Sequence, residues 1–135
     1  MTAHPISTPF GGIALFALAS ICAAQSYPTK PIRIVNTVTA GGPAELIARM
    51  VGQKFTEAWG QQAVVDSRPG AAGIIGVEIV THAAPDGYTL LLGSSMTMVL
   101  APLMRRTIPY DPIRDFAPVG MVVVSPFVLV AHPSV

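Results

Sequence analysis

The chain has 135 residues and a formal net charge of only +1, with eight Lys and Arg against seven Asp and Glu. This balance gives no basic surface of the kind that binds nucleic acid or an anionic membrane, so we expect neither as a partner. The single cysteine, Cys22, excludes a disulfide within the chain and a metal site built from several thiolates.

The first 26 residues contain no Lys, Arg, Asp or Glu, and residues 11–24 form an almost unbroken apolar run. This run is shorter than the roughly 20 residues that cross a membrane, and it is typical of the apolar part of a secretory signal peptide. We therefore expect residues 1–24 to be a signal peptide, and residues 25–135 to be periplasmic and not stably inserted in the membrane. The absence of a Lys or Arg before the run leaves a buried helix, an uncleaved anchor or a lipidated Cys22 as alternatives.

Beyond the expected signal peptide, short apolar segments alternate with segments of helical periodicity. In chain order we predict a strand at 32–38, a helix at 46–59 ended by Gly60, a buried strand at 63–66, a helix at 74–83, a strand at 88–93 and a helix from about residue 96. Strand, helix and strand in succession without a hairpin turn form a βαβ unit, which implies parallel pairing. The sequence therefore predicts an α/β domain whose mostly parallel sheet is flanked by helices.

The same patterns assign apolar residues to the core. The first helix is expected to bury one apolar stripe, comprising Leu46, Ile47, Met50, Val51, Phe55 and Trp59. Methionines are expected to fill the core around the third helix, namely Met96, Met98 and Met104. Two further apolar runs, residues 119–124 and 127–131, predict additional strands.

The join between the first strand and the first helix carries Gly41 and Gly42. A glycine pair permits a tight turn and lets a ligand approach the main chain closely. The amides that begin a helix lack partners within it, and the helix dipole makes that end slightly positive, so an anion is the natural ligand. No Lys or Arg stands between Arg33 and Arg49, which favours a small carboxylate or an uncharged polar group over a phosphate. The alternative is a turn without a ligand.

Two hydroxyl side chains, Ser94 and Ser95, stand where the third strand gives way to the next helix. Hydroxyls in this position are commonly N-caps. In an open parallel sheet, however, ligands bind at the carboxyl ends of the strands, where both this pair and Gly41 and Gly42 are expected. We therefore predict one crevice lined by both segments, and the two roles of the serines are compatible.

The sequence lacks the combinations of side chains that catalytic and metal-binding sites require. His82 stands alone in the second helix, and no His or carboxylate pair has the spacing of a metal site, so we predict no enzyme activity, no metal and no cofactor. Asp111 and Asp115 lie in a proline-interrupted segment and are expected to brace a loop.

Two other interpretations of the chain have to be considered. Residues 70–76 read G-x-x-G-x-x-G and open a helix after a strand, so a fragment of a Rossmann-type nucleotide-binding oxidoreductase has to be considered, although the spacing differs from G-x-G-x-x-G. The other alternative is a small exported interaction domain that has no small-molecule ligand and pairs through its sheet edge.

Taken together, several segments resemble one family, the extracytoplasmic solute receptors of tripartite tricarboxylate transporters, which include the Bug and TctC-like periplasmic binding proteins. The matching segments are Tyr-Pro-Thr-Lys-Pro-Ile-Arg-Ile-Val at 27–35, Gly-Gly at 41–42 with Ala-Arg at 48–49, Arg-Pro-Gly-Ala-Ala-Gly at 68–73 with Gly76, Ala-Pro-Asp-Gly-Tyr-Thr-Leu-Leu at 84–91, Pro-Tyr-Asp-Pro at 109–112 and Asp-Phe-Ala-Pro-Val at 115–119. They run in order and in register through residues 27–135.

This resemblance implies a class II periplasmic-binding-protein-like fold with two lobes that close over a small carboxylate or related polar solute and present it to the membrane subunits of a transporter. It implies a receptor rather than an enzyme. The ligand-binding positions that it implies in this chain are Thr39, Ala40, Gly41, Gly42, Pro43 and Ala44 in the first loop, and Ser94, Ser95, Met96 and Thr97 in the second.

The sequence departs from the family in three respects. Residues 36–40 replace the usual aromatic residue and prolines, and Ala44 and Glu45 replace the usual hydroxyl and aspartate. Family members are also longer, so we expect residues 25–135 to be a truncated N-terminal portion of lobe 1 that runs into the inter-lobe region. Because such receptors capture a solute by lobe closure, one incomplete lobe is not expected to bind tightly.

Overall fold

A three-stranded parallel sheet forms the centre of the computed structural model, which describes residues 27–126 and 128–134. Strand β1 (Ile32–Asn36) lies between β2 (Ala63–Ser67) and β3 (Thr89–Leu92), in the order β2-β1-β3. In this register Ile34 pairs with Val65 on one side and with Leu90 on the other. The predicted parallel sheet is confirmed. The expected signal peptide, including Cys22, lies outside the described residues.

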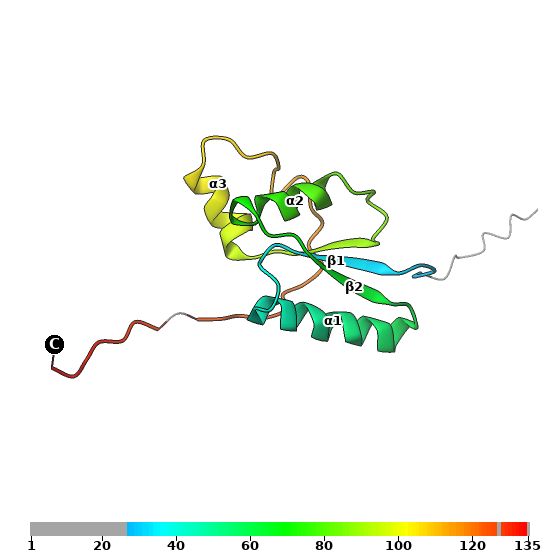
Figure 1. Cartoon of the computed structure of the whole chain (residues 1–135). Helices are drawn as coiled ribbons and strands as arrows, with labels where there is room; N and C mark the ends of the chain where they lie inside the picture. Colours follow the sequence, from blue (N-terminus) through cyan, green and yellow to red (C-terminus); the bar gives the residue numbers. More distant parts are fainter. Residues whose placement is uncertain (1–26, 127, 135) are drawn as a thin grey trace, which may run out of the picture.

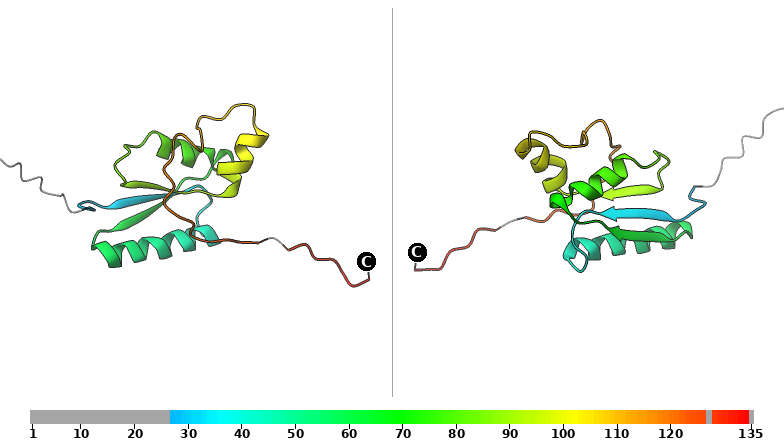
Figure 2. Two further views of the ribbon diagram at one scale, coloured as in Figure 1. Left: turned by 180° about the vertical axis from the view of Figure 1, so that it is seen from behind. Right: turned by 45° about the horizontal axis from the view of Figure 1, so that its top comes forward.

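Helices cover both faces of this sheet. Helix α1 (Pro43–Trp59) lies along one face, whereas α2 (Ile74–Thr81) and α3 (Ala101–Met104) lie on the other (Figures 1 and 2). A short 3-10 turn, η1 (Ala71–Gly73), precedes α2, and a π-helical segment, η2 (Met96–Leu100), precedes α3. No helix in the described part of the chain is both long and apolar enough to cross a membrane.

The central strand supplies the most buried side chains. Ile32, Ile34 and Val35 are each at most 3% exposed, as expected for β-branched residues in a strand that pairs on both sides. The strand is shorter than the predicted segment 32–38, because the Asn36 side chain accepts a hydrogen bond from the Val38 amide at 3.4 Å and turns the chain. The helix begins earlier than predicted, at Pro43, a residue that is well suited to the first helical position.

The buried face of α1 differs from the predicted apolar stripe. Leu46 and Met50 are 62% and 60% exposed, whereas Ala48 is fully buried. A Cβ atom at Gly52 would lie only 3.4 Å from the carbonyl oxygen of Ala63. Small residues therefore face the sheet because they allow the helix to approach it closely, and the larger side chains lie to the side.

Other predictions about the core and strands are also wrong. Strand β2 is at an edge of the sheet rather than buried, and its Val64 is 44% exposed. Met96 and Met104 are exposed rather than core residues. Residues 117–126 and 128–132 form no strand, and this run extends away from the body (Figures 1 and 2). A strand needs a neighbour to accept and donate its main-chain hydrogen bonds, and the described chain provides none there.

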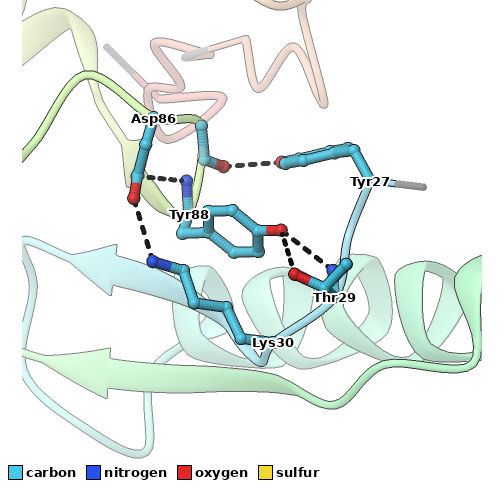
Figure 3. Close-up of polar contacts among 6 residues, drawn as sticks. Tyr27, Thr29, Lys30, Asp86 and Tyr88 are labelled. Carbon is cyan, nitrogen blue, oxygen red and sulfur yellow. Dashed lines mark hydrogen bonds and ion pairs between the residues drawn. The ribbon is translucent and has the colours of Figure 1, made fainter. Parts of the chain in front are cut away.

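The segment before β1 is fixed to the loop before β3 at the amino ends of the strands (Figure 3). The Tyr27 hydroxyl donates to the Gly87 carbonyl at 2.7 Å, and the Thr29 amide donates to the Tyr88 hydroxyl at 2.9 Å. Lys30 pairs with Asp86 at 3.0 Å and lies over the Tyr88 ring. These contacts hold the sheet at the end opposite to the predicted ligand crevice.

Candidate functional site

The loops that follow the three strands meet at the carboxyl edge of the sheet. Thr37 follows β1, Gly73 belongs to the loop after β2, and Thr97 belongs to the segment after β3. A Cβ atom added to Gly73 would lie 2.6 Å from Cγ2 of Thr97 and 3.1 Å from Cβ of Thr37. Since β1 and β3 are hydrogen-bonded neighbours, the two predicted ligand segments begin on adjacent strands, around one packed centre.

The turn at Gly41 is occupied by a carboxylate from the chain itself. The Gly41 amide donates a hydrogen bond to Oε2 of Glu45, and Arg49 Nε donates to Oε1 of the same carboxylate at 2.9 Å. The Glu45 side chain is only 10% exposed. The expectation that the amides of this turn are available to a ligand is therefore wrong for Gly41. The helix does attract an anion to its amino end, and that anion is Glu45.

The remaining amides at the start of α1 are partly satisfied. The amides of Glu45 and Leu46 donate to the Gly42 carbonyl at 3.1 and 3.3 Å. Among the described residues, no main-chain carbonyl accepts a hydrogen bond from the amide of Gly42 or of Ala44. An open depression of about 270 Å³ lies beside this turn and is lined by Gly41, Gly42, Glu45, Leu46 and Arg49.

The second predicted segment forms a closed hydroxyl turn. The Ser94 carbonyl accepts the amides of Thr97 and Met98 at 3.1 and 2.9 Å, and the Thr97 hydroxyl in turn accepts the Ser94 amide at 3.2 Å. The Ser94 hydroxyl lies 3.4 Å from the Thr97 amide, which is a long N-cap contact. The N-cap interpretation therefore applies to Ser94, whereas Ser95 is exposed.

The predicted site residues differ in how far a solute could reach them. The exposed ones are Thr39, Ala40, Gly41, Pro43, Ser95 and Met96, the half-buried ones are Gly42, Ala44 and Ser94, and Thr97 is buried. Thr97 is 1% exposed and its hydroxyl is bonded within its own turn. We therefore assign Thr97 to the support of the turn. The polar side chains of this set that a solute could reach are Thr39, Ser94 and Ser95, together with the amides near Gly42.

A larger open depression, of about 450 Å³, lies elsewhere on the molecule, between α1 and β2. It is lined by residues of α1 such as Gln53 and Thr56 and by residues 62–65. Neither predicted ligand segment contributes to it, and it lies along the edge strand instead of at the strand ends. The geometry of parallel sheets therefore favours the smaller depression as part of the site.

The glycines at 70–76 have a packing role. A Cβ atom at Gly76 would lie 3.0 Å from the Arg68 carbonyl oxygen and 3.1 Å from Cγ2 of Thr37, so this residue lets α2 approach the loop after β1.

His82 is exposed, with Nδ1 2.8 Å from the Glu78 carbonyl oxygen. No group of three or more His, Cys, Asp or Glu with metal-binding geometry occurs among the residues that the structure describes.

Loop residues 111–115 form the brace that the sequence predicts. The Asp111 amide donates to Oδ2 of Asp115 at 2.7 Å, and Oδ1 of Asp111 accepts the Ile113 amide at 2.9 Å.

Sequence reasoning missed the role of Glu45. The signal for it is present, since an acidic residue in the first turn of a helix, followed by Arg four residues later, favours an occupied helix start.

We expect the turn at Gly41 to loosen in acid. The Gly41 amide and then Arg49 hold the pKa of Glu45 below its usual value. A carboxylate with a lowered pKa in the folded state stabilises the fold above its unfolded pKa of about 4.3, and this stabilisation is lost as the pH falls through the lower, folded value. In an NMR pH titration, the Gly41 amide should shift below about pH 4.3, and Glu45→Gln should abolish the shift. A midpoint at or above that pH, or an unchanged curve in the variant, would contradict this assignment.

Comparison with known proteins identifies the fold. The periplasmic binding protein BugD superposes with a TM-score of 0.64 at 35% sequence identity, over 68% of this chain and 30% of BugD. MatC of Rhodopseudomonas palustris, solved with bound malate, superposes with a TM-score of 0.68 at 31% identity, over 71% of this chain and 33% of MatC. The predicted fold, part of a class II periplasmic-binding-protein-like architecture, is thereby confirmed.

The sequence itself identifies the family. The profile described as tripartite tricarboxylate transporter family receptor, TctC, matches residues 47–135. Protein BugT of Bordetella pertussis is 37% identical over 123 residues, which cover 90% of this chain and 38% of BugT. The chain belongs to the TctC family of receptors. It spans about a third of the length of the curated relatives it matches.

Proposed function

We propose that this chain is part of a periplasmic solute receptor that binds a small carboxylate for the membrane subunits of a tripartite transporter. The observation that carries the proposal is family membership combined with the superposition on MatC, whose structure holds malate. The receptor role involves no catalysis. Export through residues 1–24 belongs to the same proposal, as does delivery to a membrane partner.

The solute's carboxylate is bound by neutral groups at the strand ends. The candidate donors on this edge are the amides of Gly42 and Ala44, which have no main-chain acceptor among the described residues, and the hydroxyls of Thr39, Ser94 and Ser95. Neutral donors suffice for a carboxylate because each hydrogen bond to a charged acceptor is stronger than one between neutral groups. Glu45 and Arg49 compensate each other's charge, so they leave the site close to neutral.

The test is a titration of the purified chain with malate, with the neutral diamide of malate as the matched control ligand. We expect malate to bind and the diamide not to bind. The affinity should be weak, with a Kd on the order of 1 mM, because lobe closure requires a second lobe. A response to NAD with none to malate would support the nucleotide-binding alternative. No response to either compound would support an interaction domain without a ligand.

A further inference from the structure

The segment that carries the predicted ligand residues Met96 and Thr97 is a π-helix with one carbonyl that the helix itself cannot satisfy. The Ala101 amide donates to the Met96 carbonyl, five residues earlier, which sets the π register. In this register, the donor for the Thr97 carbonyl would be the amide of residue 102. That residue is Pro102, which has no N–H.

A side chain from another part of the chain supplies the missing donor. The Tyr110 hydroxyl donates a hydrogen bond to the Thr97 carbonyl. Both residues are buried, since Thr97 is 1% and Tyr110 is 6% exposed, so water cannot readily replace this bond. Burial also raises the pKa of Tyr110, and the phenol therefore remains a donor at neutral pH.

The position of Tyr110 is fixed independently of the π-helix. Its ring packs against Ile74 and Val77 of α2, and the Phe116 ring meets it edge-on, with ring centroids 6.4 Å apart. The loop that carries it is closed by hydrogen bonds between residues 111 and 115. The Tyr110 hydroxyl is therefore held in a fixed position, and its hydrogen bond restrains the Thr97 carbonyl.

We propose that Tyr110 is a positioning residue for the turn at residues 94–97. By satisfying the carbonyl that Pro102 leaves without a donor, it holds Thr97 in place. The amide and hydroxyl of Thr97 then hold Ser94. Its effect on solute affinity rests on the proposed function, whereas its effect on the turn does not.

Hydrogen exchange of the full chain tests the positioning without any ligand. In Tyr110→Phe, we expect the amides of Ser94, Thr97 and Met98 to exchange about tenfold faster, while those of β1 change little. Tyr88→Phe is the matched control, because it removes a hydroxyl hydrogen bond at the opposite end of the sheet. It should leave the exchange of these three amides unchanged.

A second variant tests the reason for the effect. Adding Pro102→Ala to Tyr110→Phe restores an N–H on the helix for the Thr97 carbonyl, so slow exchange of the turn should return. The proposal fails if Tyr110→Phe changes the three amides by less than about twofold, or if β1 accelerates equally, which would indicate only a loss of overall stability. It also fails if the double variant exchanges as fast as Tyr110→Phe.

Malate affinity gives a separate readout. Tyr110→Phe should weaken malate binding about threefold to tenfold, because the turn spends less time in its binding geometry. If the wild-type chain does not bind malate, the proposed function fails, whereas the exchange result still decides whether Tyr110 positions the turn. If malate binds and its affinity is unchanged in Tyr110→Phe while the turn loosens, the inferred link between positioning and affinity is overturned.

Discussion

Replacing Gly73 with Ala is expected to destabilise the fold by about 3 kcal/mol. Gly73 has a φ of 91°, a conformation that costs an alanine about 1–2 kcal/mol. The added Cβ would also lie 2.6 Å from Cγ2 of Thr97 and 3.3 Å from the Thr37 carbonyl oxygen. Because these are buried neighbours at the meeting point of three loops, they cannot move aside without disturbing the site.

Urea unfolding of Gly73→Ala and Gly60→Ala separates the cost of the backbone conformation from the cost of the steric contacts. Gly60 has a φ of 68° and nothing within 4 Å of the added Cβ, so this variant measures only the backbone cost, about 1 kcal/mol. Equal losses in the two variants would mean that Gly73 is not in close contact with Thr37 and Thr97. The conclusion that the three strand-end loops pack together around Gly73 would then be wrong.

Truncating Val77 to Ala is expected to lower the free energy of unfolding by about 2 kcal/mol. Val77 is fully buried and packs in the cluster that also contains Ile74 and Tyr110. The loss combines reduced burial with the cavity that the missing methyl groups leave. Denaturant unfolding with an unchanged m-value would measure it.

The matched control for this variant is Val64→Ala, which makes the same change at a position on β2 that is 44% exposed. We expect it to cost less than about 0.5 kcal/mol. If Val77→Ala is as mild as Val64→Ala, the cluster of Ile74, Val77 and Tyr110 does not contribute to the core. Tyr110 would then lack the rigid support described above.

Local patterns in the sequence predicted the elements that depend on local interactions. Gly60 ends α1 as expected, with a left-handed conformation and its amide bonded to the Thr56 carbonyl at 2.9 Å. The βαβ order was sufficient to predict parallel pairing. By contrast, apolar periodicity could not show that α1 turns Ala48 toward the sheet instead of Leu46, because helix rotation is set by how closely the two surfaces approach.

The prediction of strands in the C-terminal apolar runs was wrong for a related reason. Residues 119–124 have the composition of a strand, but a strand forms only beside a partner. Composition does not reveal whether that partner is present. Val119 and Met121 are each more than 80% exposed in this structure.

The candidate site itself stays a prediction, but the placement of its two segments was predictable in part. The sequence predicts that Gly42 and Ser94 follow strands of one parallel sheet, and the observed sheet confirms this; the adjacency of β1 and β3 was not predicted. The bond between Glu45 and the Gly41 amide could have been anticipated from the acidic first turn. The bond from Tyr110 to Thr97 could not, because it depends on a π register and on a contact between segments that lie 13 residues apart in the sequence.

The central claim is that a carboxylate is held by main-chain amides and hydroxyls at the carboxyl ends of β1 and β3. The most direct measurement is a map of amide chemical-shift changes as malate is added to the chain. The account predicts saturable changes confined to residues 39–44 and 94–97, and none with the neutral diamide of malate. Changes centred on residues 70–76 or on the depression between α1 and β2, or identical changes with the diamide, would contradict it.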